Sequence, residues 1–331
     1  MENSAKIFFL IVNYLHWLIP EVGELKKSHL ASIRLRTSPS IAAAQALGWS
    51  ITVGENISGA PSTILIGKIG ANNIEVRQER WLDQIRKIKG SAKIFLDYTD
   101  HHLGFDSSMS HFYESAIEEV DGCIVPSQSM AALLSSSWNG PISIIEDPVE
   151  IDAFPPKELA GHPATLLWFG HSSNIEFLIN FLSAGFNAGD HIRLIVLSNE
   201  AGLNHFANSN LASPAKIEFN LALWSLECMM EAAKIADLCI IPSDLGDPKK
   251  MGASSNRLIT ALTLGLPTAA DNLPSYREFA SYYSDLRSSS FREMLSDPSK
   301  FGHRVCEAQA EIKSRFSVQK VQQDWKNFFL N

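Results

Sequence analysis

The chain has 331 residues, which is more than one typical core contains and suits two domains of about 150 residues each. Apolar residues make up 45% and charged residues 19%, so disordered and fibrous classes are excluded. The formal net charge of −8 gives the molecule as a whole no electrostatic reason to hold a polyanion, and we therefore expect no nucleic-acid partner.

The four cysteines, Cys123, Cys228, Cys239 and Cys306, form no C-x-x-C pair. Cys123 and Cys239 lie inside apolar runs typical of buried strands, so we interpret them as structural thiols rather than zinc ligands or a redox pair. Free thiols indicate a reducing compartment, and we expect a cytoplasmic protein.

The apolar stretch from Ile7 to Ile19 is interrupted by Asn13 and His16 and lacks a small-residue cleavage site. It is also shorter than the roughly 20 residues that span a bilayer. We therefore interpret it as the first strand of the core rather than as a signal peptide.

The first half alternates short apolar runs with helical patterns, which predicts a parallel sheet covered by helices on both faces. The predicted strands are Ile7–Val12, Ser50–Gly54, Thr63–Ile69, Lys93–Tyr98, Gly122–Pro126 and Ile142–Glu146. The predicted helices are Ile41–Leu47, Asn72–Lys89, Ser108–Glu118 and Gln128–Ser136.

Prolines interrupt this pattern between Pro148 and Pro163, which indicates a linker, and the second half then repeats the plan. Its predicted strands are Ala164–Phe169, Ile192–Leu197, Lys216–Asn220, Leu238–Pro242 and Pro267–Ala270, and its predicted helices are Asn174–Leu182, Ser225–Ile235 and Asn256–Leu264. We predict an α/β fold of two facing, Rossmann-like, doubly wound domains at 1–150 and 160–310. Their strand C-terminal ends would surround one shared cleft.

The last 21 residues, 311–331, have a helical pattern with one apolar face. Such a face must pack against something, and a return onto the first domain would bury it. The residues of this face are Val318, Val321, Trp325, Phe328 and Phe329.

The segment Asp237–Phe279 carries the main candidate binding site. A buried strand ends at Pro242 and opens into a polar loop that contains Lys249 and Lys250, and a helix follows. Free backbone N–H groups and the macrodipole at a helix start favour an anion, and hydroxyls with nearby cations would complete a diphosphate site. A simple N-cap serine and solvated lysines are the alternative. The candidates at the helix start are Ser254, Ser255 and Asn256.

Three segments resemble GT-B glycosyltransferases of the "group 1" type. SSNRLITALTLGLPTAA and the following PSYRE are similar to the donor-binding helix and the strand after it. LLWFGHSSN, at Leu166–Asn174, is similar to the first strand and loop of the donor domain, and IRLRTSPSIAAAQALG, at Ile33–Gly48, to an early helix. The resemblance implies a nucleotide-sugar donor and no catalytic metal. The donor-binding residues would be Gly170, His171, Ser173, Lys249, Lys250, Ser254, Ser255, Asn256, Arg257 and Tyr276.

One feature departs from that family. Many retaining members carry two glutamates on the donor helix, and the matching positions here are Gly252 and Thr260. Neither side chain can accept hydrogen bonds as a carboxylate does, which puts retaining chemistry and the ribose contact in question. Asn256, Arg257 or Tyr276 would have to contact the donor instead.

The segment Phe95–Gly104, FLDYTDHHLG, places ionisable groups directly after an apolar strand. Asp100 is a candidate base toward an acceptor hydroxyl. The family resemblance implies that His101 or His102 contacts the donor sugar. A metal site and an ordinary surface loop are the competing interpretations.

Two basic features point to other partners. Arg34 and Arg36 precede a helix and are candidates for binding a phosphate-bearing acceptor, against the alternative of a solvated face. The helix Asn72–Lys89 combines an apolar stripe with a set of cations, which suits peripheral contact with an anionic membrane, although the stripe can equally pack on the sheet. Its cations are Arg77, Arg80, Arg86, Lys87 and Lys89.

We therefore expect a glycosyltransferase that transfers a sugar from a nucleotide donor to a hydroxyl of a glycan or lipid-linked acceptor, in polysaccharide biosynthesis. The location would be the cytoplasm or the inner membrane face. A nucleotide-sugar epimerase and a non-catalytic nucleotide-sugar-binding protein remain as alternatives. The latter is supported by Gly252 and Thr260, which stand where carboxylates are expected.

Overall fold

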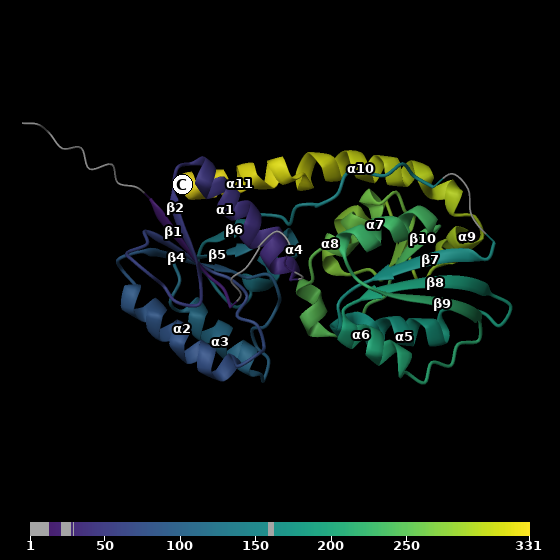
Figure 1. Cartoon of the computed structure of the whole chain (residues 1–331), viewed down its shortest axis with the longest axis horizontal. Coiled ribbons are helices and arrows are strands. Elements are labelled where there is room, and N and C mark those ends of the chain that lie inside the picture. Colours follow the sequence, from purple (N-terminus) through teal and green to yellow (C-terminus); the bar gives the residue numbers. More distant parts are fainter. Residues whose placement is uncertain (1–12, 21–27, 29, 158–161) are drawn as a thin grey trace, which may run out of the picture.

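A computed structural model describes residues 13–20, 28, 30–157 and 162–331. Its first sheet has six parallel strands in the order β2-β1-β3-β4-β5-β6 (Figure 1). The strands are β1 (Tyr14–Leu18), β2 (Ser50–Gly54), β3 (Thr63–Ile66), β4 (Lys93–Asp97), β5 (Gly122–Val125) and β6 (Ile142–Ile144). β3 and β5 are buried along their whole length because helices cover both faces of the sheet.

Helices on the two faces of this sheet form separate apolar clusters. One face packs on α2 (Ile74–Ile88), α3 (Ser108–Ile117) and α4 (Gln128–Leu134). The other face packs on α1 (Ser38–Ala46), which a short π-helix, η2 (Ile33–Thr37), precedes.

The second sheet also has six parallel strands, in the order β12-β11-β10-β7-β8-β9. Among the described residues, β7 and β10 are the neighbours at which the chain order reverses. The strands are β7 (Ala164–Phe169), β8 (His191–Ser198), β9 (Lys216–Leu223), β10 (Leu238–Ile241), β11 (Thr268–Ala270) and β12 (Ser284–Asp285).

Helices again cover both faces of the second sheet. One set comprises α5 (Ile175–Ala184), α6 (Glu200–Ala207), α9 (Ser289–Ser296) and the short η6 (Pro298–Phe301). The other comprises α7 (Leu226–Ile235), α8 (Asn256–Thr263), α10 (Gly302–Phe316) and the short η5 (Pro274–Phe279). Gly265, with φ +76, ends α8 in the left-handed conformation, which glycine adopts without strain.

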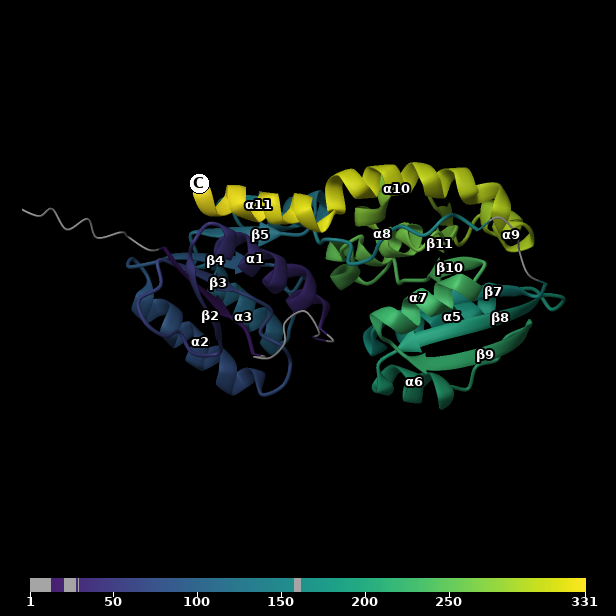
Figure 2. The same cartoon turned by 45° about the horizontal axis from the view of Figure 1, so that its top comes forward.

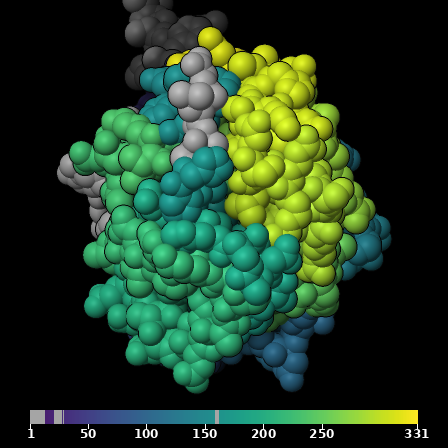
Figure 3. Space-filling view, turned by 90° about the vertical axis from the view of Figure 1, so that its right-hand side faces the viewer, coloured from purple at the N-terminus to yellow at the C-terminus, as the bar shows by residue number. Residues whose placement is uncertain are grey.

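The C-terminal helices connect the two domains. α10 lies along the second domain, and α11 (Val318–Leu330) returns to the first, as Figure 2 shows. The yellow α9–α10 region covers one side of the second domain in Figure 3. Trp325 and Phe328 of α11 pack edge-on against Trp17 and Phe95 of the first sheet, with ring centroids 6.1 and 4.8 Å apart. The prediction that the last helix crosses back is therefore confirmed.

The strands and helices lie close to the predicted ranges, with two differences of note. The predicted strand Ile7–Val12 lies outside the described residues, and the first described strand is Tyr14–Leu18. α6 and α9 were not predicted from the sequence. The domain limits 1–150 and 160–310 stay predictions, with the two sheets on either side of the proline-rich linker.

The basic helix α2 does not present a free cationic face. Its apolar stripe, with Trp81 and Ile85 fully buried, packs on the first sheet. Each of its predicted cations has an acidic partner: Glu55 for Arg77 and Arg80, Glu119 for Arg86 and Lys89, and Asp83 for Lys87. The membrane-contact interpretation therefore loses both of its supports. In the part of the chain that the structure describes, no helix has the length and apolar character needed to cross a bilayer.

Candidate active site

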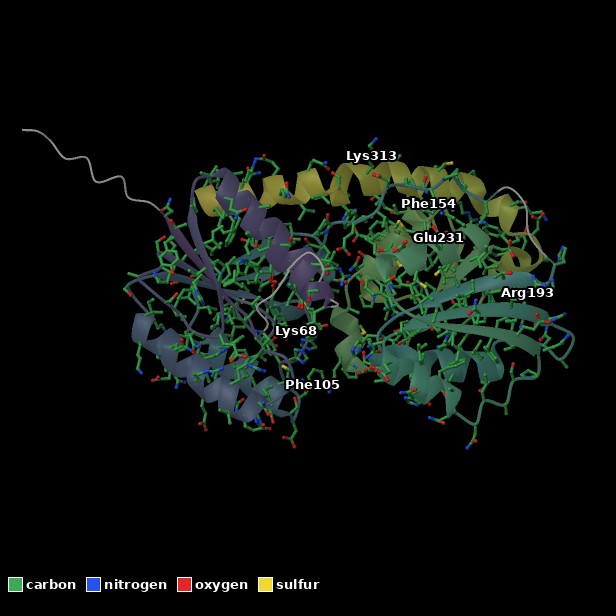
Figure 4. All side chains as sticks on the ribbon, in the orientation of Figure 1. Lys68, Phe105, Phe154, Arg193, Glu231 and Lys313 are labelled. Carbon is green, nitrogen blue, oxygen red and sulfur yellow. The ribbon has the colours of Figure 1, made fainter. Side chains whose placement is uncertain are left out.

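The strand ends that carry the predicted site residues face one another across the two domains. In the second domain the loops after β7 and β10 flank the point where strand order reverses, which is where open α/β sheets bind ligands. In the first domain the loops after β3 and β4 contribute Lys68 and Phe105, which lie on the side that faces the second domain (Figure 4). The site is therefore built from both domains.

The loop after β7 is joined to the loop after β10 through one side chain. Lys250 Nζ donates a hydrogen bond of 2.8 Å to Asn174 Oδ1 at the end of the short helix η3 (Ser172–Asn174). His171 caps this turn, because its ring nitrogen accepts a hydrogen bond from the Ser173 backbone N–H at 3.3 Å. Gly170 lies close to the Trp168 ring: an added Cβ would stand 3.0 Å from it, so the ring would have to shift by a few tenths of an ångström.

The loop after β10 contains the two predicted lysines on the short helix η4 (Pro248–Gly252), which Asp247 caps. Lys249 is exposed, and its Nζ lies 5.3 Å from the centre of the Phe105 ring in the first domain. Lys250 is half-buried, and burial followed by the charge of Arg257 holds the pKa of its ammonium below the ordinary value. These contacts indicate a crowded cationic region.

The start of α8 leaves several donors without protein partners. Ser255 occupies the N-cap position but makes no side-chain cap, and among the described residues neither its hydroxyl nor that of Ser254 is hydrogen-bonded. Arg257 Nη1 is buried and has no hydrogen-bond partner. Within the described ranges, no salt bridge joins Lys250 or Arg257 to a carboxylate. An unpaired buried donor is costly, so an anionic group would stabilise this region.

Asp100, in the first domain, is paired with Lys68 through an Nζ–Oδ2 contact of 2.5 Å. Protein crowds the carboxylate, yet 45% of the Asp100 side-chain surface stays accessible to solvent. Burial acts to raise the pKa of Asp100, but the charge and the hydrogen bond of Lys68, with the charge of Lys250, outweigh it and hold that pKa below its ordinary value. Asp100 is therefore ionised near neutral pH, and its accessible carboxylate can accept a hydrogen bond from a hydroxyl.

The sequence reasoning missed Lys68, although a signal was present. It follows the buried strand β3 by two residues, so it stands at the same sheet edge as Asp100. The residue before it, Gly67, packs closely against Ile19: an added Cβ would stand 2.6 Å from Ile19 Cγ2.

His101 and His102 follow Asp100 in the same loop. Burial lowers the pKa of both imidazoles, that of His102 to about 4. His102 stacks on Tyr113 with ring centroids 5.0 Å apart and an interplanar angle of 4°. Both histidines are therefore neutral at physiological pH.

The position of Gly252 explains why a family glutamate is missing there. Gly252 is buried against the first domain, and an added Cβ would stand 2.9 Å from His101 Cβ and 2.5 Å from Met130 Cε. A longer side chain would overlap both residues. The second position, Thr260, directs its hydroxyl to Asn256 Oδ1 at 3.4 Å, a contact within α8 itself.

The surroundings of Arg36 contradict the prediction that it binds an acceptor. Only 1% of its side chain is exposed, and its guanidinium is held by Asp97 at 2.6 Å, by Asp147 at 3.4 Å and by the Ile145 carbonyl oxygen. Its face also lies 5.2 Å from the Trp325 ring centre. With every side occupied by protein groups, no donor remains for a ligand, and the solvated-face alternative is wrong too.

Arg34 and Tyr276 also differ from expectation. Arg34 Nε pairs with Glu150 Oε1 at 3.0 Å, and its guanidinium covers the Trp224 ring at 4.8 Å. It therefore ties the first domain to the linker and to the second domain. Tyr276 is 1% exposed inside the apolar cluster of the second domain, so it supports Arg257 from the core rather than contacting a donor directly.

The metal interpretation of the Asp100 loop finds no support in geometry. In the described part of the chain, no group of three or more His, Cys, Asp or Glu side chains is arranged to hold an ion. The charged neighbour of Asp100 is instead the ammonium of Lys68.

Comparison with known proteins gives matches by structure. No family model and no curated protein matches the sequence. An alpha-glucosyltransferase solved with UDP-glucose and DNA superposes with a TM-score of 0.59 at 11% identity, over 96% of this chain and 99% of that one. Anabaena HepE with UDP-glucose gives 0.58 at 12%, over 96% and 99%. Sucrose-phosphate synthase from Thermosynechococcus elongatus gives 0.59 at 11%, over 96% and 98%.

One partner prediction has to be corrected. The net charge of −8 led us to exclude nucleic acid, but an alpha-glucosyltransferase of the same fold was solved in complex with DNA. The prediction is wrong because a local surface, not the charge of the whole chain, meets a polyanion.

The order of the strands, the facing sheets, the returning helix and these superpositions together show that the chain has the GT-B fold of nucleotide-sugar-dependent glycosyltransferases.

Proposed function

We propose that this protein transfers a sugar from a nucleoside diphosphate sugar to an acceptor hydroxyl, with the reaction centre between the two domains. The observation that carries the proposal is the unpartnered, buried Nη1 of Arg257 beside Lys250 at the start of α8. Asp247 lies near Lys250, but within the described residues neither Lys250 nor Arg257 forms a salt bridge with a carboxylate, so these cations and the open helix start can take up an anion. The bound UDP and UDP-glucose in proteins of this fold support a diphosphate as that anion.

The chemistry follows from where charge develops. Negative charge builds on the leaving diphosphate during sugar transfer, and groups already aimed at that position lower the barrier. Lys250, Arg257 and the backbone N–H groups of Ser255 and Asn256 would stabilise it. We propose no metal or other cofactor, because these side chains provide the positive charge that a cation would otherwise supply.

Asp100 would accept the proton of the acceptor hydroxyl. Its lowered pKa keeps it ionised, its side chain is accessible, and Lys68 fixes one of its oxygens. Proton transfer to a positioned side chain contributes about 10²- to 10⁴-fold in rate. Met130 and His101 fill the space where a glutamate would stand at position 252, so the second domain offers no carboxylate there.

The donor sugar is proposed to be a hexose and the acceptor a glycan, including a lipid-linked one.

A binding screen followed by one substitution tests this function. Nucleoside diphosphate sugars are titrated into the protein by calorimetry, and release of the nucleoside diphosphate is then followed with the best binder. We expect Asp100→Asn to keep donor affinity and to lose 10²- to 10⁴-fold in turnover. The matched control is Asp106→Asn, an exposed carboxyl in the same loop, which should leave turnover unchanged.

Two results would count against the proposal in different ways. Absence of binding by every nucleoside diphosphate sugar would remove the donor assignment. Full turnover by Asp100→Asn would keep the donor assignment but remove Asp100 as the base. Binding without any nucleotide release would favour a non-catalytic protein instead.

A further inference from the structure

The phenol of Tyr98 makes three hydrogen bonds in the loop that carries Asp100 and His101. It is fully buried at the end of β4. Its hydroxyl oxygen accepts from the backbone N–H of His102 at 2.7 Å and from that of Leu103 at 3.0 Å. The same hydroxyl lies 3.1 Å from Nδ1 of His101.

The number of donors and acceptors fixes the direction of the third bond. A phenolic hydroxyl has one proton to give and two lone pairs with which to accept. Both lone pairs of Tyr98 are engaged by backbone N–H groups, so the contact with His101 Nδ1 must use the phenolic proton. Burial raises the pKa of Tyr98, which keeps that proton on the phenol.

A histidine whose Nδ1 accepts a hydrogen bond carries its proton on Nε2. Nε2 of His101 has no protein partner among the described residues, and it is not one of the buried polar atoms that lack a partner. It therefore reaches accessible space beside Gly252, whose backbone packs against His101.

We propose that Tyr98 is a positioning residue that locks His101 as the neutral Nε2–H tautomer. His101 then presents a fixed hydrogen-bond donor to an oxygen atom of the bound substrate, and it cannot serve as the base. Proton acceptance is left to Asp100, the residue that immediately precedes His101 in the loop. The role toward substrate rests on the proposed function, whereas the tautomer is a property of the protein alone.

The same arrangement opposes protonation of His101. A charged imidazole would have to donate from Nδ1, where Tyr98 has no free lone pair to receive it. Burial acts in the same direction by lowering the pKa of His101. The ring stays neutral, so its donor character persists throughout the physiological range of pH.

Nitrogen NMR of ¹⁵N-histidine-labelled protein tests the tautomer without any substrate. The His101 signals are assigned by their loss in His101→Gln. We expect a bare, pyridine-type Nδ1 and a protonated, pyrrole-type Nε2 in the unmodified protein. A protonated Nδ1 in the unmodified protein would overturn the proposal, and this result does not depend on the folding of any variant.

Tyr98→Phe removes the phenolic proton and should allow both tautomers to appear. Tyr113→Phe is the matched control, because it removes another buried hydroxyl from the same aromatic cluster and leaves His101 Nδ1 untouched. A single Nε2–H tautomer retained in a folded Tyr98→Phe protein would also overturn the proposal.

The functional arm compares two amides at position 101. Glutamine can place an N–H near the position of Nε2, whereas asparagine places it near that of Nδ1. We expect His101→Gln to bind the nucleoside diphosphate sugar about fivefold more tightly than His101→Asn, the equivalent of one hydrogen bond. Equal binding with the expected tautomer would remove only the contact with substrate. Absence of binding by the unmodified protein would instead count against the proposed function.

Discussion

Arg36, in η2 of the first domain, and Arg257, at the start of α8 in the second, have opposite surroundings. The guanidinium of Arg36 is enclosed by Asp97, Asp147 and a backbone carbonyl. Arg257 lies at the start of α8 with one buried nitrogen unpartnered. Both arginines were candidates for contact with a charged substrate, and only one of them is available for it.

The difference shows that an arginine is open to a ligand only where the fold has not already supplied its counterion. In the first domain the cation serves the structure, because it joins η2 to β4 and to the segment after β6. In the second domain, Arg257 keeps one buried nitrogen without a hydrogen-bond partner, and a diphosphate oxygen could accept that hydrogen bond. Substitutions at these positions should therefore affect different properties.

The largest effect is expected from Arg36→Met. Removing the arginine leaves Asp97 buried without its partner, and breaking a buried pair in this way costs about 3–5 kcal/mol. Urea unfolding measures the free energy. Arg193→Met, which removes an exposed partner of Glu218, is the control and should cost at most about 1 kcal/mol. Equal losses for both variants would show that the Arg36 network does not hold the domain together.

A pH-dependent effect of similar origin is expected at Asp147. Burial and the charge of Asp97 raise the pKa of Asp147 to about 6 against the pull of Arg36, whereas an unfolded Asp titrates near pH 3.9. Its protonated form is thus favoured by folding, so this stabilisation is full below about pH 4 and is lost as the pH rises through 6.

Asp147→Asn removes that titration. Between pH 4 and pH 7 the unmodified protein should lose on the order of 2–3 kcal/mol of unfolding free energy relative to the variant. Urea unfolding at a series of pH values checks this. A constant difference between the two proteins across the range would contradict the assignment.

Arg257→Gln should have its main effect on binding. A hydrogen bond to a charged group contributes about 1.5–3 kcal/mol, so affinity for the nucleoside diphosphate sugar should fall by roughly 10- to 150-fold. Unfolding free energy should change little, because Arg257 is partly buried and its buried Nη1 has no partner to lose. Arg277→Gln, an exposed arginine on the neighbouring η5, is the control for calorimetry. A loss of stability without a loss of affinity would reverse the comparison.

Much of the site's location could be predicted because strand ends and helix starts are local features. Asp100 and His101 follow an apolar strand, and Ser254 to Arg257 lie at a helix start, so their positions at a strand end and a helix start followed from short-range pattern. Lys68 was within reach of the same reasoning, since it also follows a strand. The contact between the Tyr98 hydroxyl and the His101 ring could not be predicted from the sequence, because it depends on how the loop after Tyr98 folds.

The sequence alone determined the two parallel sheets, most of their helices and the family resemblance, since continuous apolar strands and helical periodicity are encoded over short stretches; α6 and α9 were the helices it did not predict. Only the tertiary structure decided which charged groups are free. Arg36 meets Asp97 and Asp147, 61 and 111 residues away in the chain, and Gly252 meets His101 and Met130 across the domains. Such neighbours arise when distant segments pack together, and no local pattern records them.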